Sequence, residues 1–275
     1  MMRRILLALE RGDDDGGAVA LAALLARRRR LEILLLRVEE WPMFGPFGMG
    51  WSNAIRACDL AAVKARLDAE NDGRTRILSP ESMTSNAAIE QARLRAVSLL
   101  LMTYRQERPL MRVMYGSPSD RILRDAPVPV LAIPGPARPV SRIFYLFDGG
   151  TAGVPGLRHV IDFAQLFEAE VALMRVRLPA PVAEDKPPVE DRMLSILRRR
   201  DVAFRLLPGT DDPAPVVSRE GADLVILSKT HETGKPCTSL ARRLLHQASV
   251  PLLLTSEGPA PGPFVGADAP LRVGI

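Results

Sequence analysis

An internal duplication constrains the fold of this chain more than any other feature of its sequence. A run near the N-terminus, Arg-Arg-Ile-Leu-Leu-Ala-Leu-Glu, ends at Glu10, and it returns as Ser-Arg-Ile-Phe-Tyr-Leu-Phe-Asp, ending at Asp148. A second pair follows in the same order, because 123–132 and 245–254 share the pattern Leu-x-x-Ala-x-Val-Pro. Two matched pairs in the same order indicate two tandem copies of one domain.

Each copy alternates short apolar runs with longer helical stretches. The apolar runs are continuous, which is typical of parallel strands buried on both faces. We therefore predict an α/β fold with a doubly wound parallel sheet of five strands in each copy. The predicted strands are 4–9, 31–38, 75–78, 97–102 and 128–133 in copy 1, and 142–147, 170–176, 202–207, 223–227 and 251–254 in copy 2. The predicted helices include 17–29, 53–69, 154–167 and 190–199.

A proline-rich stretch separates the copies. Residues 134–139, Pro-Gly-Pro-Ala-Arg-Pro, suit neither a helix nor a central strand. We place copy 1 at 1–135, copy 2 at 140–257 and a C-terminal tail at 258–275. The final strand of each copy should be a sheet edge, and exposed edges tend to pair. The copies are therefore expected to pack as an intramolecular pseudo-dimer along these strands, with a homodimer of the whole chain left open.

Composition narrows the class of protein. The chain has 275 residues and is 47% hydrophobic, yet its apolar runs are far shorter than the roughly 20 residues of a membrane span. No signal-peptide core precedes the first strand, so we expect a cytoplasmic protein. Its two cysteines, Cys58 and Cys237, have no partner at metal-ligand spacing, so no metal site is predicted. The net charge is +5, but the few aromatic residues are not interleaved with basic ones, which disfavours a nucleic-acid partner.

Two loops of each copy are candidates for ligand binding. In doubly wound sheets, ligands collect at the carboxyl ends of the strands, where the winding reverses. The first such loop follows Glu10 or Asp148, and the second spans 103–117 or 228–239. The second loops end at Gly116-Ser117 and Thr238-Ser239, where helices are predicted to start. Free backbone N–H groups at a helix start suit phosphate, although a serine there also acts as an ordinary N-cap.

These residues resemble the universal stress protein family over nearly the whole chain. The segment 116–131, Gly-Ser-Pro-Ser-Asp-Arg-Ile-Leu-Arg-Asp-Ala-Pro-Val-Pro-Val-Leu, is similar to the closing segment of that family. In copy 2, 221–227 is similar to its fourth strand and 209–214 to the exit of its third strand. The resemblance implies the strand order 3-2-1-4-5 and a stress-response binding or regulatory role. It also implies, for members that bind ATP, a loop of the form Gly-x2-Gly-x9-Gly-Ser/Thr.

That glycine motif is degenerate in both copies. In copy 1 the two earlier glycine positions fall on Thr103 and Gln106, and only Gly116 and Ser117 match the motif. In copy 2 the loop is shorter, and its last position is Thr238, before Ser239. Glycine allows close backbone approach and positive φ angles that threonine and glutamine resist, so phosphate binding should be weakened in both copies.

The adenine end of the expected site is degenerate in a different way. The aspartate that the family places after its first strand corresponds to Glu10 in copy 1 and to Asp148, followed by Gly149, in copy 2. We expect at most one weak adenine-nucleotide site for ATP or AMP, with copy 1 favoured, and binding of no nucleotide is an equal alternative. The other candidate contacts are Val38 and Met102 in copy 1, and Val176, Ser228 and Ser239 in copy 2.

Two further features lead to the remaining predictions. The three histidines, His159, His231 and His246, are not accompanied by a nucleophile motif, and we predict a protein that is not an enzyme. The segment 41–51, Trp-Pro-Met-Phe-Gly-Pro-Phe-Gly-Met-Gly-Trp, is either a lid over the sheet or an interaction surface for an unknown protein partner, a lipid or an apolar ligand. The second interpretation gives an alternative function, a nucleotide-independent protein-interaction module acting through residues 41–51.

Overall fold

The computed structural model describes residues 3–10, 16–38, 59–79, 84–104, 118–148, 153–176, 189–228 and 234–255. The strands are β1 (Arg4–Leu9), β2 (Glu32–Arg37), β3 (Thr75–Ile77), β4 (Leu99–Thr103), β5 (Val130–Ile133), β6 (Arg142–Phe147), β7 (Glu170–Val176), β8 (Phe204–Thr210), β9 (Leu224–Ser228) and β10 (Leu252–Thr255). The helices are α1 (Gly17–Arg29), α2 (Leu60–Glu70), α3 (Ser85–Leu94), α5 (Pro118–Asp125), α6 (Gly153–Phe167), α7 (Val189–Arg199), α8 (Pro213–Arg219) and α9 (Gly234–Gln247).

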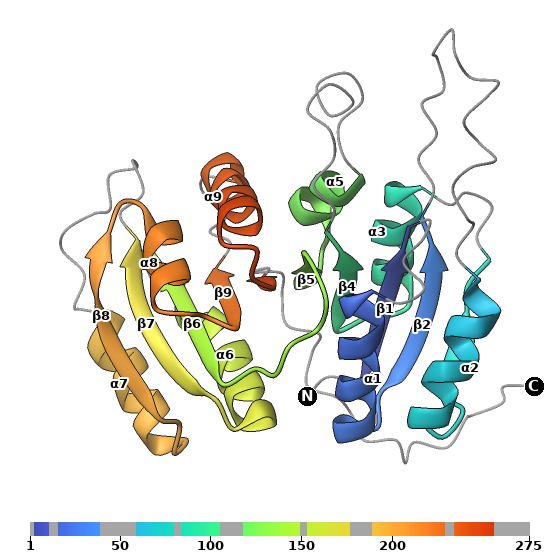
Figure 1. Ribbon diagram of the computed structural model, residues 1–275, viewed down its shortest axis with the longest axis horizontal. Coiled ribbons are helices and arrows are strands. Elements are labelled where there is room, and N and C mark those ends of the chain that lie inside the picture. The colour runs from blue at the N-terminus through green and yellow to red at the C-terminus, as the bar shows by residue number, and fades with distance from the viewer. Residues whose placement is uncertain are drawn as a thin grey trace, which may run out of the picture.

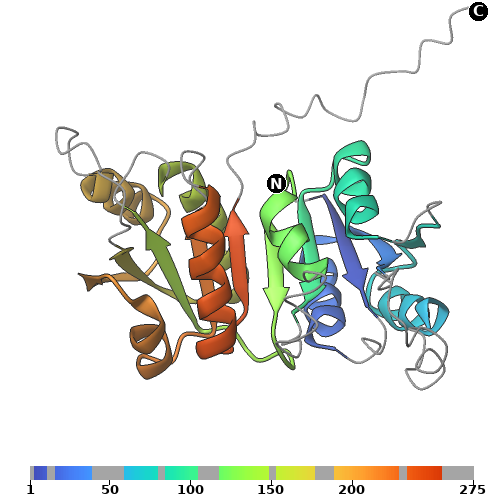
Figure 2. The ribbon, with the colours of Figure 1, turned by 90° about the horizontal axis from the view of Figure 1, so that it is seen from above.

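All ten strands form one sheet, in the order β3-β2-β1-β4-β5-β10-β9-β6-β7-β8. Each half therefore has the predicted order 3-2-1-4-5, and neighbouring strands within each half are parallel. The halves join where β5 pairs with β10 in the antiparallel direction, as Figure 2 shows. The predicted α/β fold is confirmed, and so is the predicted pairing of the two copies along their final strands.

Helices cover both faces of this sheet (Figure 1). On one face α1 and α2 of copy 1 and α6 and α7 of copy 2 enclose a hydrophobic cluster that runs through both copies. On the other face α3 and α5 of copy 1 and α8 and α9 of copy 2 enclose a second such cluster. The two copies thus share both of their hydrophobic cores.

The apolar strands contribute side chains alternately to these two cores. In β1, Ile5, Leu7 and Leu9 belong to the first cluster, whereas Leu6 and Ala8 belong to the second. All five side chains are at most 3% exposed. Successive side chains of a strand point to opposite faces, so a central strand covered on both faces needs an unbroken apolar run.

The duplication is visible in the backbone geometry in addition to the sequence. Helix α1 is followed by Arg30 with φ 50°, and α6 is followed by Glu168 with φ 56°. Residues Ala96, after α3, and Gly221, after α8, also have positive φ, at 49° and 66°. A left-handed residue just after a helix is a common way to end it. These two pairs of equivalent helices therefore end in the same way in both copies.

Two helix starts differ from the sequence-based prediction. Helix α2 begins at Leu60 rather than at residue 53, because Asp59 caps it by accepting hydrogen bonds from Ala61 N and Ala62 N, at 3.0 and 3.1 Å. Helix α9 begins at Gly234, so the prediction that it starts at Thr238-Ser239 is wrong. Pro236 lies in the first turn of α9, where a proline displaces no helical hydrogen bond.

Gly17, the first residue of α1, lies against the segment that joins the copies. A Cβ at this position would clash with the carbonyl oxygen of Gly135 and lie 2.7 Å from the backbone nitrogen of Ala137. We expect Gly17→Ala to lower the free energy of unfolding by about 1–3 kcal/mol in urea titrations, since backbone atoms must move to relieve the clash. The matched control is Gly135→Ala, whose Cβ would meet nothing within 4 Å. Equal stabilities of the two variants would contradict this prediction.

Candidate functional site

The carboxyl ends of β1, β2 and β4 bring together the predicted site residues of copy 1 that the structure describes. Glu10 directly follows β1, Val38 follows β2, and Thr103 is the last residue of β4. The strands are held in register here, because the Val38 N–H donates to Leu9 O at 2.8 Å and Ala8 pairs with Met102. These residues lie where the sheet reverses its winding, as the sequence predicted.

A contact across this edge joins β1 to α5. The hydroxyl of Ser119, in the first turn of α5, donates to Oε1 of Glu10 at 3.2 Å, although the two residues are 109 positions apart. Ser119 itself is 3% exposed, whereas Glu10 is partly exposed. The carboxylate that follows the first strand is therefore held against the start of α5.

The apolar candidates at the same edge are buried. Val38 is 3% exposed, and Met102 and Val176 are each 2% exposed. All three belong to the hydrophobic cluster beneath α3, α5, α8 and α9. Thr103 is partly exposed, and its Oγ1 atom has no hydrogen-bond partner among the described residues. Among the described residues of copy 1, Glu10 is thus the polar candidate that combines some exposure with a position at the edge, because the hydroxyl oxygen of Thr103 is buried.

Copy 2 places its candidates less favourably. Asp148 follows β6 and is partly exposed, while Ser228 ends β9, is 6% exposed and pairs with Thr255 of β10. Thr238 and Ser239 lie inside α9 rather than at its start, and Ser239 is exposed. The free N–H groups of a helix belong to its first turn, so Ser239 is one turn too late to mark a phosphate site.

Several predicted residues lie outside the described parts of the chain. They are Gln106, Gly116, Ser117 and Gly149, together with His231 and the aromatic segment 41–51. Their roles remain predictions.

A polar cluster that sequence reasoning missed lies beside Ser119 and joins the two copies. Asp120 of α5 is 7% exposed and accepts two hydrogen bonds from Arg242 of α9, at 2.8 and 3.2 Å. The hydroxyl of Tyr104, directly after β4, lies 3.1 Å from Nε2 of His246 in α9 and 3.5 Å from Oδ1 of Asp120. An alignment of the two copies would have shown that the equivalent positions 120 and 242 carry opposite charges.

The described histidines form no catalytic constellation. His159 in α6 is 8% exposed and accepts a hydrogen bond from Nε of Arg158 at 3.2 Å. Burial and, to a smaller extent, the nearby Arg158 cation lower the pKa of His159 to about 4, so the ring is neutral near pH 7. His246 faces Tyr104. Neither histidine has a described serine or cysteine nucleophile as a hydrogen-bond partner.

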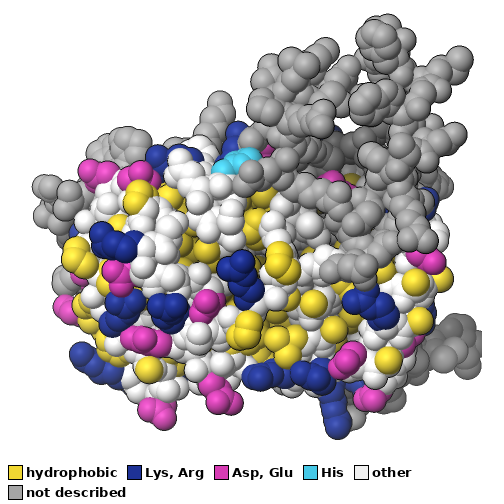
Figure 3. Space-filling model, viewed as in Figure 1, with side chains coloured by type: hydrophobic (Ala, Val, Ile, Leu, Met, Phe, Trp, Pro, Cys, Tyr) yellow, Lys and Arg dark blue, Asp and Glu magenta, His cyan; other side chains and the backbone are white. Residues whose placement is uncertain are grey.

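The described residues contain no cluster of three or more potential metal ligands. Within the same ranges, no helix is long and apolar enough to cross a membrane. On the face shown in Figure 3, arginine and lysine side chains are interspersed with aspartate and glutamate rather than gathered into one patch.

The fold is that of a tandem α/β protein, in which two doubly wound domains share one sheet. Polar side chains lie at the carboxyl ends of its strands. Residues 1–134 match the model of the universal stress protein family. The first half of the chain therefore belongs to the universal stress protein family, and the second half repeats the same fold. Members of this family are stress-response proteins and are generally not enzymes.

Solved structures resemble the chain over both halves. A universal stress protein from Archaeoglobus fulgidus DSM 4304 has a TM-score of 0.67 at 14% identity, covering 93% of this chain and 96% of its own. A protein assigned to the universal stress proteins from Pseudomonas aeruginosa UCBPP-PA14 has a TM-score of 0.61 at 20% identity, covering 92% and 93%.

The cytoplasmic domain of a prokaryotic cation chloride cotransporter has a TM-score of 0.57 at 14% identity, covering 92% of this chain and 95% of its own. A comparison with curated proteins gives no match. At these identities the structural likeness supports the tandem fold alone.

The buried His159 predicts a pH dependence of stability. Its pKa is about 4 in the folded chain and about 6.5 when unfolded, so between these values the unfolded chain binds more protons. This contribution is complete above about pH 6.5 and is lost as the pH falls toward 4. Between pH 7.5 and 5 we expect it to lower the free energy of unfolding by about 2 kcal/mol.

Urea titrations of His159→Leu should lack this part of the pH dependence, whereas His231→Gln should keep it. Leucine is the residue that copy 1 carries at the equivalent position, Leu21, which is also buried. An unchanged pH profile in His159→Leu would show that the ring is not buried in its neutral form.

Proposed function

We propose that this protein is a stress-response binding protein of regulatory type, whose two adenine-nucleotide sites are degenerate. Copy 1 is the better site and binds ATP or AMP weakly at the carboxyl ends of β1 and β4. The protein releases the nucleotide unchanged, in line with a family whose members are generally not enzymes. It acts through its nucleotide-bound and nucleotide-free forms rather than through turnover.

The contact between Glu10 and Ser119 carries this proposal. In a doubly wound domain, a nucleotide must fit between the end of the first strand and the start of the helix that precedes the last strand. In copy 1 these two elements are bridged by one hydrogen bond of 3.2 Å. A nucleotide entering this space has to separate the two side chains, which reduces its affinity.

The negative charge of Glu10 also disfavours nucleotide binding. Ser119 lies in the first turn of α5, where the helix dipole and free N–H groups favour an anion. Glu10 already supplies a carboxylate there, so the phosphates of a nucleotide would approach a like charge. At about 4 Å in a water-like dielectric, one such repulsion costs about 1 kcal/mol.

Copy 2 is the weaker candidate for two reasons. Asp148 supplies a carboxylate at the adenine end, but Ser239 is displaced from the first turn of α9. No residue at the predicted motif positions of copy 2 is a glycine, so the close approach of a phosphate to the backbone is disfavoured.

Titration calorimetry with ATP and AMP tests the proposal. We expect one site per chain with a dissociation constant between about 10 µM and 1 mM, which is weak for a dedicated nucleotide site. Gly116→Val should abolish the binding signal by blocking the phosphate end of copy 1. Ser239→Ala is the matched change in copy 2 and should leave the signal unchanged. Submicromolar affinity, or no detectable binding at all, would each refute a weak nucleotide site.

A second measurement isolates the role of Glu10. Glu10→Gln preserves the size of the side chain and its ability to accept from Ser119, but it removes the negative charge. We expect ATP to bind roughly five-fold more tightly to this variant, the equivalent of about 1 kcal/mol. Asp148→Asn, the matched change in copy 2, should not strengthen binding. A weaker affinity in Glu10→Gln would mean that the carboxylate binds the nucleotide directly instead of competing with its phosphates.

A further inference from the structure

The two copies are related by a pseudo-twofold axis whose position can be read from equivalent residues. Leu131 of β5 pairs with Leu253 of β10, and these two leucines occupy the same position in the two copies. A residue that meets its own equivalent lies on the axis relating the two domains. The axis therefore crosses the sheet between Leu131 and Leu253. It passes between α5 and α9 on one face and between α1 and α6 on the other (Figure 1).

In a dimer of identical domains, each residue on such an axis faces a second copy of itself. Such residues must therefore be self-complementary. In this chain the pairs at the axis are unlike residues on both faces of the sheet.

On the face of the sheet covered by α5 and α9, the equivalent residues at the axis carry opposite charges. Asp120 and Arg242 are 122 positions apart, the same separation as Leu131 and Leu253, so they are equivalent residues. They form an ion pair of 2.8 Å, and the Asp120 side chain is only 9% exposed. Two copies of the first domain would bring Asp120 against Asp120, and two of the second would bring Arg242 against Arg242. Like charges at this distance are unfavourable, most strongly for two Asp120 carboxylates, which would be largely buried, and less so for two Arg242 side chains, because Arg242 is 41% exposed.

On the α1 and α6 face, the unlike pair consists of a donor and an acceptor. The guanidinium of Arg28 donates to the carbonyl oxygen of Leu166, and these residues are equivalent, 138 positions apart like the first residues of β1 and β6. Arg29 adds a bond to Asp162 O at 3.3 Å. Two copies of the second domain would leave the helix carbonyl without this donor, and two of the first would place two arginine cations together.

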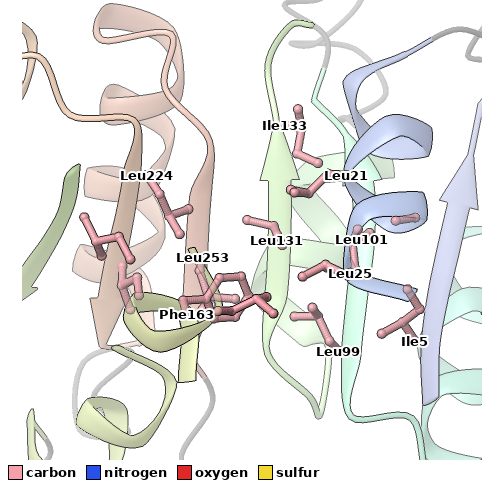
Figure 4. Packing of buried hydrophobic residues seen from close by; sticks show 14 of the residues in the cluster. Ile5, Leu21, Leu25, Leu99, Leu101, Leu131, Ile133, Phe163, Leu224 and Leu253 are labelled. Carbon is pink, nitrogen blue, oxygen red and sulfur yellow. The ribbon is translucent and has the colours of Figure 1, made fainter. Parts of the chain in front are cut away.

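Side-chain size differs at the axis as well. Leu25 of α1 and Phe163 of α6 are equivalent, both are fully buried, and both belong to the cluster shared by the copies. Figure 4 shows Phe163 beside Leu253, on the side facing Leu131 and Leu25. Replacing the leucine by a second phenylalanine would overfill this region, whereas two leucines would leave it underpacked.

We infer that each copy can pair only with the other copy and not with a second copy of itself. The surface formed by β5, α1 and α5 binds the surface formed by β10, α6 and α9, and neither surface binds an identical one. The occupant of each surface is the other half of the same chain. The surface through which identical domains could pair is therefore already used inside the chain. Any homodimer has to form elsewhere.

A charge-exchange cycle in the full-length chain tests this inference. The variants are Asp120→Arg, Arg242→Asp and the double exchange, measured by urea unfolding at low salt. Each single variant recreates a like-charge pair, and we expect the folding equilibrium constant to fall by about ten-fold or more. The double exchange should recover to within about three-fold of the original chain. A double variant whose loss equals the sum of the two single losses would overturn the inference.

Two further variants distinguish repulsion between like charges from the simple loss of an ion pair. Asp120→Asn removes the attraction without creating a like charge, so it should be clearly less damaging than Asp120→Arg. Asp212→Arg is the positional control, because Asp212 pairs at 3.6 Å with the exposed Arg243, next to Arg242 but within copy 2. It should change stability little. If Asp120→Asn were as damaging as Asp120→Arg, the pair would only stabilise the fold and would not discriminate between partners.

Discussion

The antiparallel pairing of β5 with β10 is the interaction on which the rest of the structure depends. It turns two five-stranded sheets into one and removes the edge that each would otherwise expose. It also brings α5 against α9 and α1 against α6, so that both hydrophobic clusters extend across the junction. The polar pairs at the junction, Asp120 with Arg242 and Arg28 with Leu166 O, exist only because the strands meet in this register.

Much of this fold could be predicted from local sequence patterns. The bounds of β1, α1, β6 and β7 match the prediction, because an unbroken apolar run defines a buried parallel strand and a basic last turn suits the end of α1. The bounds of helix α3 were not predicted, since its sequence is rich in alanine and polar residues and its start depends on Thr84, which caps Ala87 N at 3.4 Å. Helix α9 starts earlier than predicted because a proline in its first turn resembles a loop when only the sequence is considered.

The candidate site was less predictable than the fold, for a physical reason. Sequence comparison correctly placed Glu10 and Thr103 at the carboxyl edge, but it could not show that Glu10 contacts Ser119. Such a contact depends on side-chain length and on how closely α5 approaches β1, and neither quantity leaves a periodic signal. Ser119 and Asp120 lie in the segment that most resembles the family, yet their partners are 109 and 122 positions away.

The covalent link between the copies has a consequence for how the two halves can change. In a dimer of separate chains, every substitution appears twice, and pairing weakens on dilution. Here residues 134–141 hold the halves at a high effective concentration, so pairing is independent of protein concentration. Each substitution also appears only once. One half can therefore lose a ligand contact while the other retains it, which allows a single gene product to sample combinations of sites that no symmetric assembly can reach.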